Sequence, residues 1–141
     1  MAEGILRSRL TQLRREDVQV SSMGIHGLDN QPASTEAVGV CAEAGVDISE
    51  PRSRSLEGDE LIGADLILVM DGLQRDFIKM FFPQVRDRVF LLGSWPEESR
   101  KPKKDAVRDP IGKSTKVYRN VYRTIEKHVE RIAPHLLRMY H

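Results

Sequence analysis

The C-terminal third of the chain carries most of the side chains that could attract a charged ligand. Residues 100–141 hold 12 basic and 4 acidic residues, whereas residues 1–99 hold 10 basic and 17 acidic ones. Such a region could steer an anionic ligand, for example a phosphoester, or an acidic protein surface. The alternative is a solvated helix face and a lysine-rich loop without any ligand.

Nucleic-acid binding through this region is disfavoured, because its basic cluster lacks interleaved aromatic residues beyond Trp95 and matches no known motif. The cluster consists of Lys101, Lys103, Lys104, Arg108 and Lys113.

Thiol and imidazole chemistry have few candidates in this sequence. Cys41 is the only cysteine, which excludes an internal disulfide and a cysteine-based metal cluster and is typical of a reducing compartment. Cys41 falls on an apolar helical stripe, so we expect a small buried hydrophobic side chain rather than a nucleophile. The histidines lack ligand spacing with one another or with acidic pairs, so no metal site is predicted. They are His26, His128, His135 and His141.

The elements that must position any site follow from hydrophobic periodicity. Helical spacing of apolar residues predicts four helices, over residues 2–15, 34–45, 73–82 and 117–133. Ser34 is the predicted N-cap of the second helix, which stops at Gly45. Pro134 is expected to kink or stop the last one. Short apolar runs predict strands at 18–21, 64–70 and 89–92, and residues 93–114 are predicted to be a loop. Strands that alternate with helices form an open parallel sheet, an α/β fold. The first helix has no strand before it, although crossover helices link two parallel strands, so we expect a further strand upstream.

Composition excludes several classes of protein. The chain has 141 residues, 40% of them hydrophobic and 30% charged, with net charge +1, which is typical of one globular domain. The longest purely apolar run, 66–70, is far shorter than the roughly 20 residues of a membrane span, and residues 1–15 contain no signal-peptide pattern. We therefore expect a single cytoplasmic domain over 1–141 that does not enter a membrane.

Several motifs resemble, in the correct order, those of the low-molecular-weight protein tyrosine phosphatases and the related bacterial arsenate reductases. The opening M-A-E-G resembles the start of the helix that follows the family's phosphate loop, C-x5-R-S-P. The other matches are residues 21–25, 31–33, 45–49 with 52–54, 66–71, 91–94 and 109–112. No single match is specific, but the ordered series covers almost the whole chain.

The resemblance implies a cofactor-independent phosphatase that acts on phosphotyrosine proteins or small aryl phosphates through a cysteinyl-phosphate. Such hydrolysis needs a thiolate of low pKa as the nucleophile. It needs backbone N–H groups around the phosphate, and the N-terminus of a helix supplies such groups. It also needs an arginine that binds the phosphate through two hydrogen bonds and an acid that protonates the leaving phenolate. Asp109 matches the family's acid, in a loop that Pro110 stiffens, although Asp-Pro is also a common turn opener. Ser22 matches a hydroxyl that supports the phosphate loop, or is a turn residue at the end of a strand.

The nucleophilic loop itself does not occur in the sequence. A C-x5-R motif that began at Cys41 would need arginine at the position of Asp47. We therefore expect no turnover by the family mechanism from the chain as written, and arsenate reduction is excluded because it needs further cysteines. Two explanations stay open: the recorded start is an internal methionine directly after the loop, or the chain is a truncated paralogue that binds phosphorylated or acidic partners without catalysis. The expected fold is a three-layer open parallel sheet flanked by helices, without its first central strand.

Other positions also depart from the family pattern. Pro51 stands where many relatives have histidine, and Ile111 and Gly112 replace the aromatic pair that eukaryotic members have after Asp-Pro. The substrate wall is therefore weaker, and selectivity for phosphotyrosine stays open. Tyr118 and Tyr122 share one face of the last helix and are expected to pack in the core.

Overall fold

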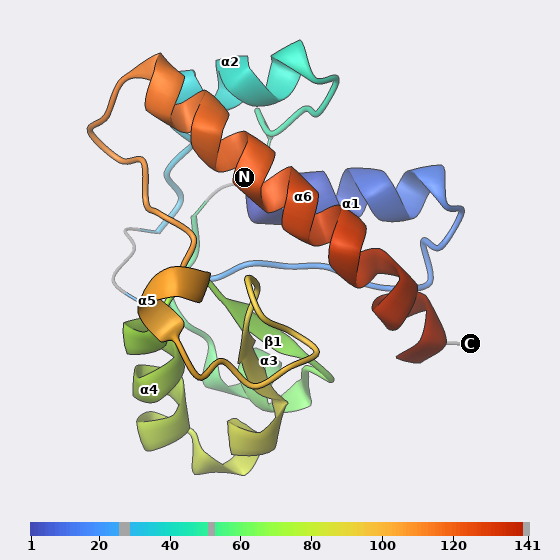
Figure 1. Ribbon diagram of the computed structural model, residues 1–141, viewed down its shortest axis with the longest axis vertical. Helices are drawn as coiled ribbons and strands as arrows, with labels where there is room; N and C mark the ends of the chain where they lie inside the picture. Colours follow the sequence, from blue (N-terminus) through green and yellow to red (C-terminus); the bar gives the residue numbers. More distant parts are fainter. Residues whose placement is uncertain (26–28, 51–52, 140–141) are drawn as a thin grey trace. The chain divides into compact units, whose positions relative to one another are not determined.

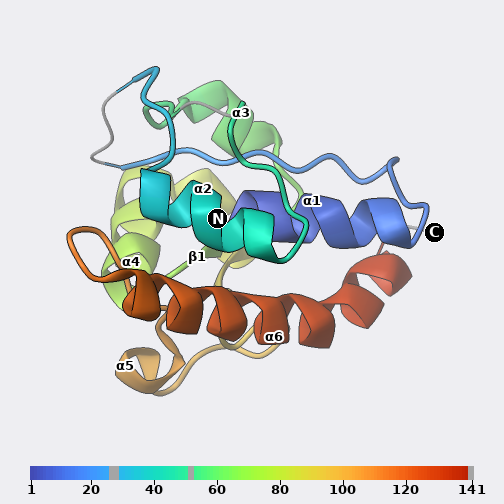
Figure 2. The ribbon, with the colours of Figure 1, turned by 90° about the horizontal axis from the view of Figure 1, so that it is seen from above.

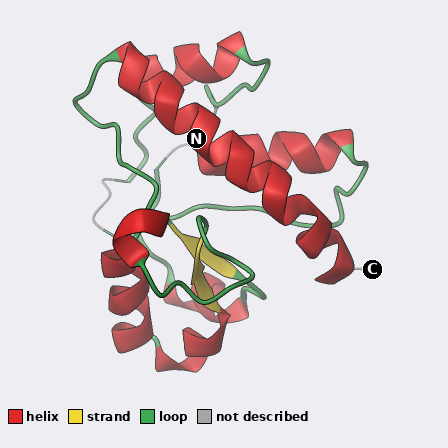
Figure 3. Cartoon of the chain, viewed as in Figure 1, coloured by secondary structure: helices red, strands yellow, loops and turns green. Residues whose placement is uncertain are grey.

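The computed structural model describes residues 1–25, 29–50 and 53–139, and the chain divides into two compact units. Unit 1 comprises Met1–Ser55 and Asp109–His141, and unit 2 comprises Leu56–Arg108. The elements are α1 (Ala2–Gln12), α2 (Thr35–Glu43), α3 (Gly58–Gly63), β1 (Ile67–Val69), α4 (Gly72–Phe81), the 3-10 helix η1 (Pro83–Arg88), β2 (Val89–Leu91), α5 (Pro102–Asp105) and α6 (Thr115–Met139) (Figures 1 and 3). The single domain over 1–141 stays a prediction beside this division.

Unit 2 contains the parallel strand pair that the apolar runs predict. β1 and β2 pair in parallel with Ile67 opposite Val89 and Val69 opposite Leu91, and α4 forms the crossover between them. Alternate strand residues are buried because the pleat turns them toward the covered face. The buried apolar residues of this unit are Leu61, Ile67, Val69, Ile78, Val85, Val89, Leu91, Leu92, Trp95 and Val107. The observed βαβ arrangement confirms the predicted α/β class.

The described residues of unit 1 form three helices, α1, α2 and α6. Both α1 and α2 pack against α6, which runs past them in both views (Figures 1 and 2). The α6 side chains recurring at steps of three and four residues form the buried stripe: Tyr118, Val121, Tyr122, Ile125, Val129, Ile132, Ala133 and Leu136. The two tyrosines are therefore core residues, as predicted.

Side-chain caps fix where two of the helices begin. The hydroxyl of Ser34 accepts a hydrogen bond from the N–H of Ala37 at 3.2 Å, which confirms Ser34 as the N-cap of α2. Its own proton goes to the hydroxyl oxygen of Tyr118 at 3.2 Å, so the cap also ties α2 to α6. Asp71 caps α4 by accepting from the N–H of Gln74 at 2.8 Å.

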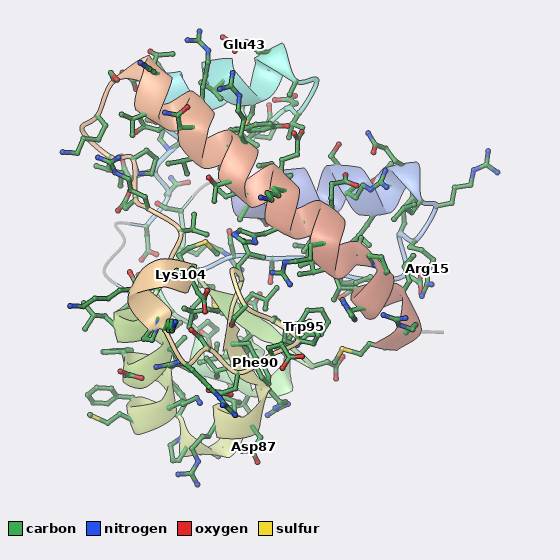
Figure 4. The ribbon with its side chains drawn as sticks, viewed as in Figure 1. Arg15, Glu43, Asp87, Phe90, Trp95 and Lys104 are labelled. Atoms are coloured by element: carbon green, nitrogen blue, oxygen red, sulfur yellow. The ribbon has the colours of Figure 1, made fainter. Side chains whose placement is uncertain are left out.

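A salt bridge also joins α2 to α6. Arg119 on α6 makes two hydrogen bonds, of 2.9 and 3.0 Å, to the carboxylate of Glu43 at the end of α2. Glu43 is labelled in Figure 4. Because both side chains are exposed, this pair aligns the helices more than it stabilises them.

The prediction of a strand at 18–21 is wrong. These residues belong to no strand in the structure, because a strand needs a neighbour for its backbone groups and the described residues provide none beside them. The carbonyl of Val20 instead accepts a hydrogen bond from Arg7.

Three helical features also differ from the expectation. α3 and α5 are short helices that the periodicity did not predict; α3 precedes β1, and α5 lies inside the predicted loop 93–114. α6 continues through Pro134 to Met139, so Pro134 does not end it. The buried Ala133 and Leu136 on either side of Pro134 hold this last part of α6 in place. In the part of the chain that the structure describes, no helix combines the length and hydropathy needed to cross a bilayer.

Candidate active site

The predicted acid, Asp109, lies in the loop that leads into α6. Its Oδ1 accepts a hydrogen bond from the backbone N–H of Ile111 at 3.0 Å, and the carbonyl of Pro110 accepts from the N–H of Lys113 at 2.9 Å. Gly112 completes the turn with φ +77°, a conformation that glycine adopts without strain. Asp109 is exposed, and Oδ2 has no hydrogen bond among the described residues. The carboxyl group is therefore oriented by one oxygen while the other can give a proton to a ligand.

The second predicted site residue, Ser22, is bound to the first turn of α1. Its hydroxyl donates to Oε2 of Glu3 at 2.9 Å, and its carbonyl accepts from Nη2 of Arg54 at 3.1 Å. Ser22 is thus held on both sides, by the start of a helix and by a segment more than 30 residues later. Its hydroxyl thus donates to a carboxylate, and a role in supporting a phosphate loop stays a prediction.

A small backbone network keeps the Ser22 segment in place. The N–H of Gly24 donates to the carbonyl of Arg54 at 2.8 Å, and Gly24 pairs with Ser55 as a parallel bridge. Oδ1 of Asp29 accepts from both the N–H and the hydroxyl of Ser55, at 2.6 and 2.8 Å. These hydrogen bonds to the charged form lower the pKa of Asp29. The loop before α2 is therefore fixed to the segment around Ser55.

Sequence reasoning missed Glu3 and Arg7 as partners of this network. Nη2 of Arg7 donates to Oε1 of Glu3 at 3.0 Å and to the carbonyl of Val20, while the Glu3 side chain is only 17% exposed. The spacing of four residues on a helix was the available signal for the ion pair. Nothing local in the sequence indicates that Glu3 also binds Ser22.

The N-terminus of α1 has the properties that favour the binding of an anion. α1 begins at Ala2 without a side-chain cap, so the N–H groups of its first turn are not satisfied within the helix, and the positive end of the helix dipole lies there. α1 also packs tightly, because a Cβ on Gly4 would lie 2.5 Å from Cγ2 of Ile48.

The structure brings Ser22, but not Asp109, into hydrogen-bonding contact with the start of α1. Asp109 and Ser22 belong to the same compact unit, yet none of the hydrogen bonds in the described residues joins them. The predicted basic cluster is exposed, and its members divide between the units, with Lys113 in unit 1 and the other four in unit 2.

Cys41 is unsuited to nucleophilic chemistry. It is a free cysteine with 0% of its surface exposed, on the apolar face of α2. Burial raises the pKa of its thiol, so the thiolate is disfavoured. The prediction of a small buried hydrophobic side chain is confirmed.

His128 and His135 on α6 each lie beside an arginine. Nδ1 of His135 lies 2.9 Å from Nη2 of Arg138, and Nδ1 of His128 lies 3.4 Å from Nη2 of Arg131. Within residues 1–25, 29–50 and 53–139, no group of three or more potential ligands gathers into a metal site. Pro51, His26 and His141, which the sequence analysis named, lie outside the described residues.

Comparison with known proteins settles the family. Residues 1–139 match the family model described as low molecular weight phosphotyrosine protein phosphatase. The chain belongs to this family. The recognition made from the ordered motifs is thereby confirmed, although no single motif carried it.

Relatives and solved structures agree with this assignment. The chain is 35% identical over 136 residues, 96% of this chain and 86% of the relative, to the probable low molecular weight protein-tyrosine-phosphatase EpsP of Ralstonia nicotianae. The crystal structure of the low molecular weight protein tyrosine phosphatase from T. tengcongensis is 29% identical with a TM-score of 0.83, covering 94% of this chain and 87% of that one. Vibrio vulnificus Wzb in complex with benzylphosphonate is 25% identical with a TM-score of 0.81, covering 94% and 86%. The predicted fold class, a parallel sheet flanked by helices, is therefore confirmed.

Proposed function

We propose that this phosphatase-family chain supplies the acid side of a site that hydrolyses phosphotyrosine or small aryl phosphates without a cofactor. Asp109 is assigned the role of general acid, and Ser22 the role of a hydroxyl that supports the phosphate loop. The observation that carries the proposal is the geometry of Asp109, an exposed carboxyl group with Oδ1 anchored to the N–H of Ile111 and Oδ2 open. A single thiol in the chain favours the reducing cytoplasm as its location.

The chemistry divides between this chain and a nucleophilic loop. In the family reaction a thiolate attacks the phosphorus, the bond to the phenol oxygen breaks, and the acid gives its proton to that oxygen. Water then hydrolyses the cysteinyl-phosphate, and the same carboxylate takes up the proton. These 141 residues contain no C-x5-R motif, and Cys41 is buried. We therefore infer that they do not complete this cycle by themselves.

The substrate class is supported by the surroundings of Asp109. Ile111, two residues after the acid, is 76% exposed, so it offers an apolar surface beside the carboxyl group. The related Vibrio protein was solved with benzylphosphonate, a ligand that combines an aromatic ring with a phosphonate. An isoleucine in place of an aromatic residue provides packing but no stacking, which favours small aryl phosphates as much as phosphotyrosine.

The test compares the chain with and without a nucleophilic loop. The 141-residue chain is expected to leave p-nitrophenyl phosphate unhydrolysed, whereas the chain preceded by a designed β-strand and C-x5-R loop is expected to hydrolyse it. A matched protein with serine in place of the introduced cysteine controls for contaminating phosphatases. Turnover by the unmodified chain would contradict the assignment, as would a restored loop that binds phosphate and gives no turnover.

The role of Asp109 makes a separate prediction in the loop-restored protein. Asp109→Asn is expected to lower kcat for phenyl phosphate by about 10²–10³, since the leaving phenolate then departs without a proton. The loss should be much smaller for p-nitrophenyl phosphate, whose leaving group is stable as an anion. Asp105→Asn serves as the control in the same assay. Equal losses on the two substrates would show that Asp109 acts in some way other than as an acid.

The second candidate is a binding module without catalysis. The specific observation in its favour is the exposed basic region that follows residue 99, which could hold phosphorylated or acidic partners. It predicts saturable, salt-sensitive binding of such partners, with no turnover even after a C-x5-R loop is restored.

A further inference from the structure

A run of exposed cations in unit 2 is left without a role by the proposed site. Residues 100–108 contain five basic residues and one acidic residue. The basic ones are Arg100, Lys101, Lys103, Lys104 and Arg108, and all five are exposed. We call them the α5 cation cluster, because α5 lies at its centre and carries Lys104 (Figure 4).

The α5 cation cluster differs from Arg119 and Arg138 of α6 in having no side-chain partner among the described residues. None of its five side chains makes an ion pair or hydrogen bond within the described residues, whereas Arg119 on α6 binds Glu43 and Arg138 contacts His135. The one acid within the run, Asp105, accepts a hydrogen bond from the hydroxyl of Ser99 at 2.7 Å. Within the part of the chain that the structure describes, the positive charges of the cluster are therefore not neutralised.

The backbone beneath the cluster is firmly attached to the rest of unit 2. The N–H of Val107 donates to the carbonyl of Met70, the residue after β1, at 2.8 Å, and the Val107 residue is 5% exposed. The carbonyl of Asp105 approaches Gly93 so closely that a Cβ there would lie 1.9 Å from its oxygen. Nη1 of Arg75 donates to the carbonyl of Ser99 at 3.3 Å. A fixed backbone presents the cations together, so less order must be gained when a ligand binds.

The surroundings favour a polypeptide over a nucleic acid as the occupant. Residues 96–108 contain no aromatic side chain, so the segment provides no platform on which bases could stack. Glu97 is exposed just before the cluster and would repel an evenly charged polyanion, whereas the neighbouring Glu98 is paired with Lys79 at 3.4 Å. A peptide can place acidic residues against the cations and a neutral or basic residue against Glu97.

We propose that the α5 cation cluster is a docking surface for an acidic, extended segment of a protein partner. That the partner is a phosphoprotein substrate rests on the proposed function, because Arg108 directly precedes the candidate acid Asp109 in the chain. Acidic residues near the phosphorylated residue of a substrate would then raise its affinity without contacting the reacting atoms.

The test measures binding without catalysis. The full chain is titrated against a short fluorescein-labelled peptide of alternating glutamate and serine, and fluorescence anisotropy is recorded. Its glutamine counterpart and single-stranded oligodeoxythymidylate are the comparison ligands. Lys103→Glu with Lys104→Glu removes the centre of the cluster, and Lys116→Glu with Lys127→Glu on α6 is the control with the same change in net charge. A milder pair, Lys103→Gln with Lys104→Gln, serves if the first does not fold.

The acidic peptide is expected to bind in preference to both comparison ligands. The α5 double variant should weaken this binding about tenfold or more while the α6 control stays near wild type, and binding should weaken as salt rises from about 0.05 to 0.3 M. Equal losses in both double variants would overturn the proposal, since net charge alone would explain them. Tighter binding of the oligonucleotide, lost in the α5 variant, would overturn it in favour of nucleic acid.

A kinetic measurement keeps this inference distinct from the proposed function. In the loop-restored protein, the α5 variant is expected to raise KM for an acidic phosphopeptide and to leave kcat for p-nitrophenyl phosphate unchanged. If the KM for the acidic phosphopeptide is unchanged in the α5 variant, the docking proposal is overturned. Turnover in the same assay would still support the phosphatase proposal. Failure of all turnover would refute the phosphatase proposal and leave the peptide titration to decide this one.

Discussion

Among single side chains, Tyr122 shows most directly how burial changes chemistry in this molecule. It is 6% exposed on α6, and burial, followed by the nearby carboxylate of Glu126, raises its pKa from 10.0 to about 12. Between these values the unfolded chain binds fewer protons than the folded one, so the stability from neutral Tyr122 is complete below pH 10 and is lost as the pH rises toward 12.

Tyr122→Phe is therefore expected to remove the phenol titration near pH 12. Tyrosinate absorbance recorded against pH should lose its step near pH 12, and the decline of the urea midpoint above pH 10 should become shallower. Tyr118→Phe is the matched control on the same helix face. A step near pH 12 that persists in the Tyr122 variant would show that another group is responsible.

The contacts of Ser22 show which part of the site depends on distant residues. Its hydroxyl reaches Glu3 across 19 positions, and its carbonyl is bound by Arg54 across 32 positions. The types and order of the motifs were enough to select Ser22 and Asp109 as candidates. The partners that orient Ser22 follow only from the tertiary packing of α1 against the segments around residues 22 and 54.

For the elements, the connection after β2 depends on one glycine. Gly93 lies against the backbone of Asp105, and an added Cβ would be 1.9 Å from its carbonyl oxygen and 2.9 Å from its carbonyl carbon. Because backbone atoms form this contact, a side-chain rotation cannot relieve it. Gly39, inside α2, has nothing within 4 Å of the corresponding position.

These two glycines give a matched pair of substitutions. Gly93→Ala is expected to destabilise the protein by about 3 kcal/mol or more through backbone displacement, whereas Gly39→Ala should stabilise it by about 0.5–1 kcal/mol because alanine favours the helix. Urea unfolding followed by circular dichroism measures both. Near-equal midpoints for the two variants would mean that the Gly93–Asp105 approach is not maintained in solution.

Elements marked by the chemistry of their own residues could be predicted from the sequence. Elements that depend on a neighbouring segment of the chain could not. Ser34 carries its capping role in its own chemistry, and the predicted cap is present, whereas the cap that Asp71 forms on α4 was not predicted. The residues at 18–21 alternate as a strand does, but alternation cannot supply the neighbouring backbone that a strand requires. α3 and α5, of six and four residues, are too short for hydrophobic periodicity to reveal them.

At the scale of the whole molecule, the response to acid depends on carboxyl groups in the first part of the chain. Four of them, among the described residues of 1–55, have lowered pKa values. Hydrogen bonds to their charged forms are the main cause: from Arg15 to Asp17, from Ser55 to Asp29, from Arg119 to Glu43 and from Ser49 to Asp47. A carboxyl group of this kind adds stability above its unfolded pKa, 3.8 for Asp and 4.5 for Glu. That stability is lost as the pH falls through the lower folded value, because the unfolded chain takes up protons first. The protein is therefore expected to lose stability below pH 4.5.

Asp29 is the best single test of this acid sensitivity, because Ser55 provides both hydrogen bonds to its carboxylate. In Asp29→Asn the amide oxygen can still accept both bonds, so the fold should persist while the titrating charge is gone. Urea midpoints measured from neutral pH down to acid are expected to fall less steeply than in the wild type, from a slightly lower starting value. Ser55→Ala, which keeps the backbone donor and removes the hydroxyl, should give an intermediate slope. If the Asp29 variant follows the wild-type slope throughout, the acid loss of stability comes from the other carboxylates, and the link between Asp29 and Ser55 carries none of it.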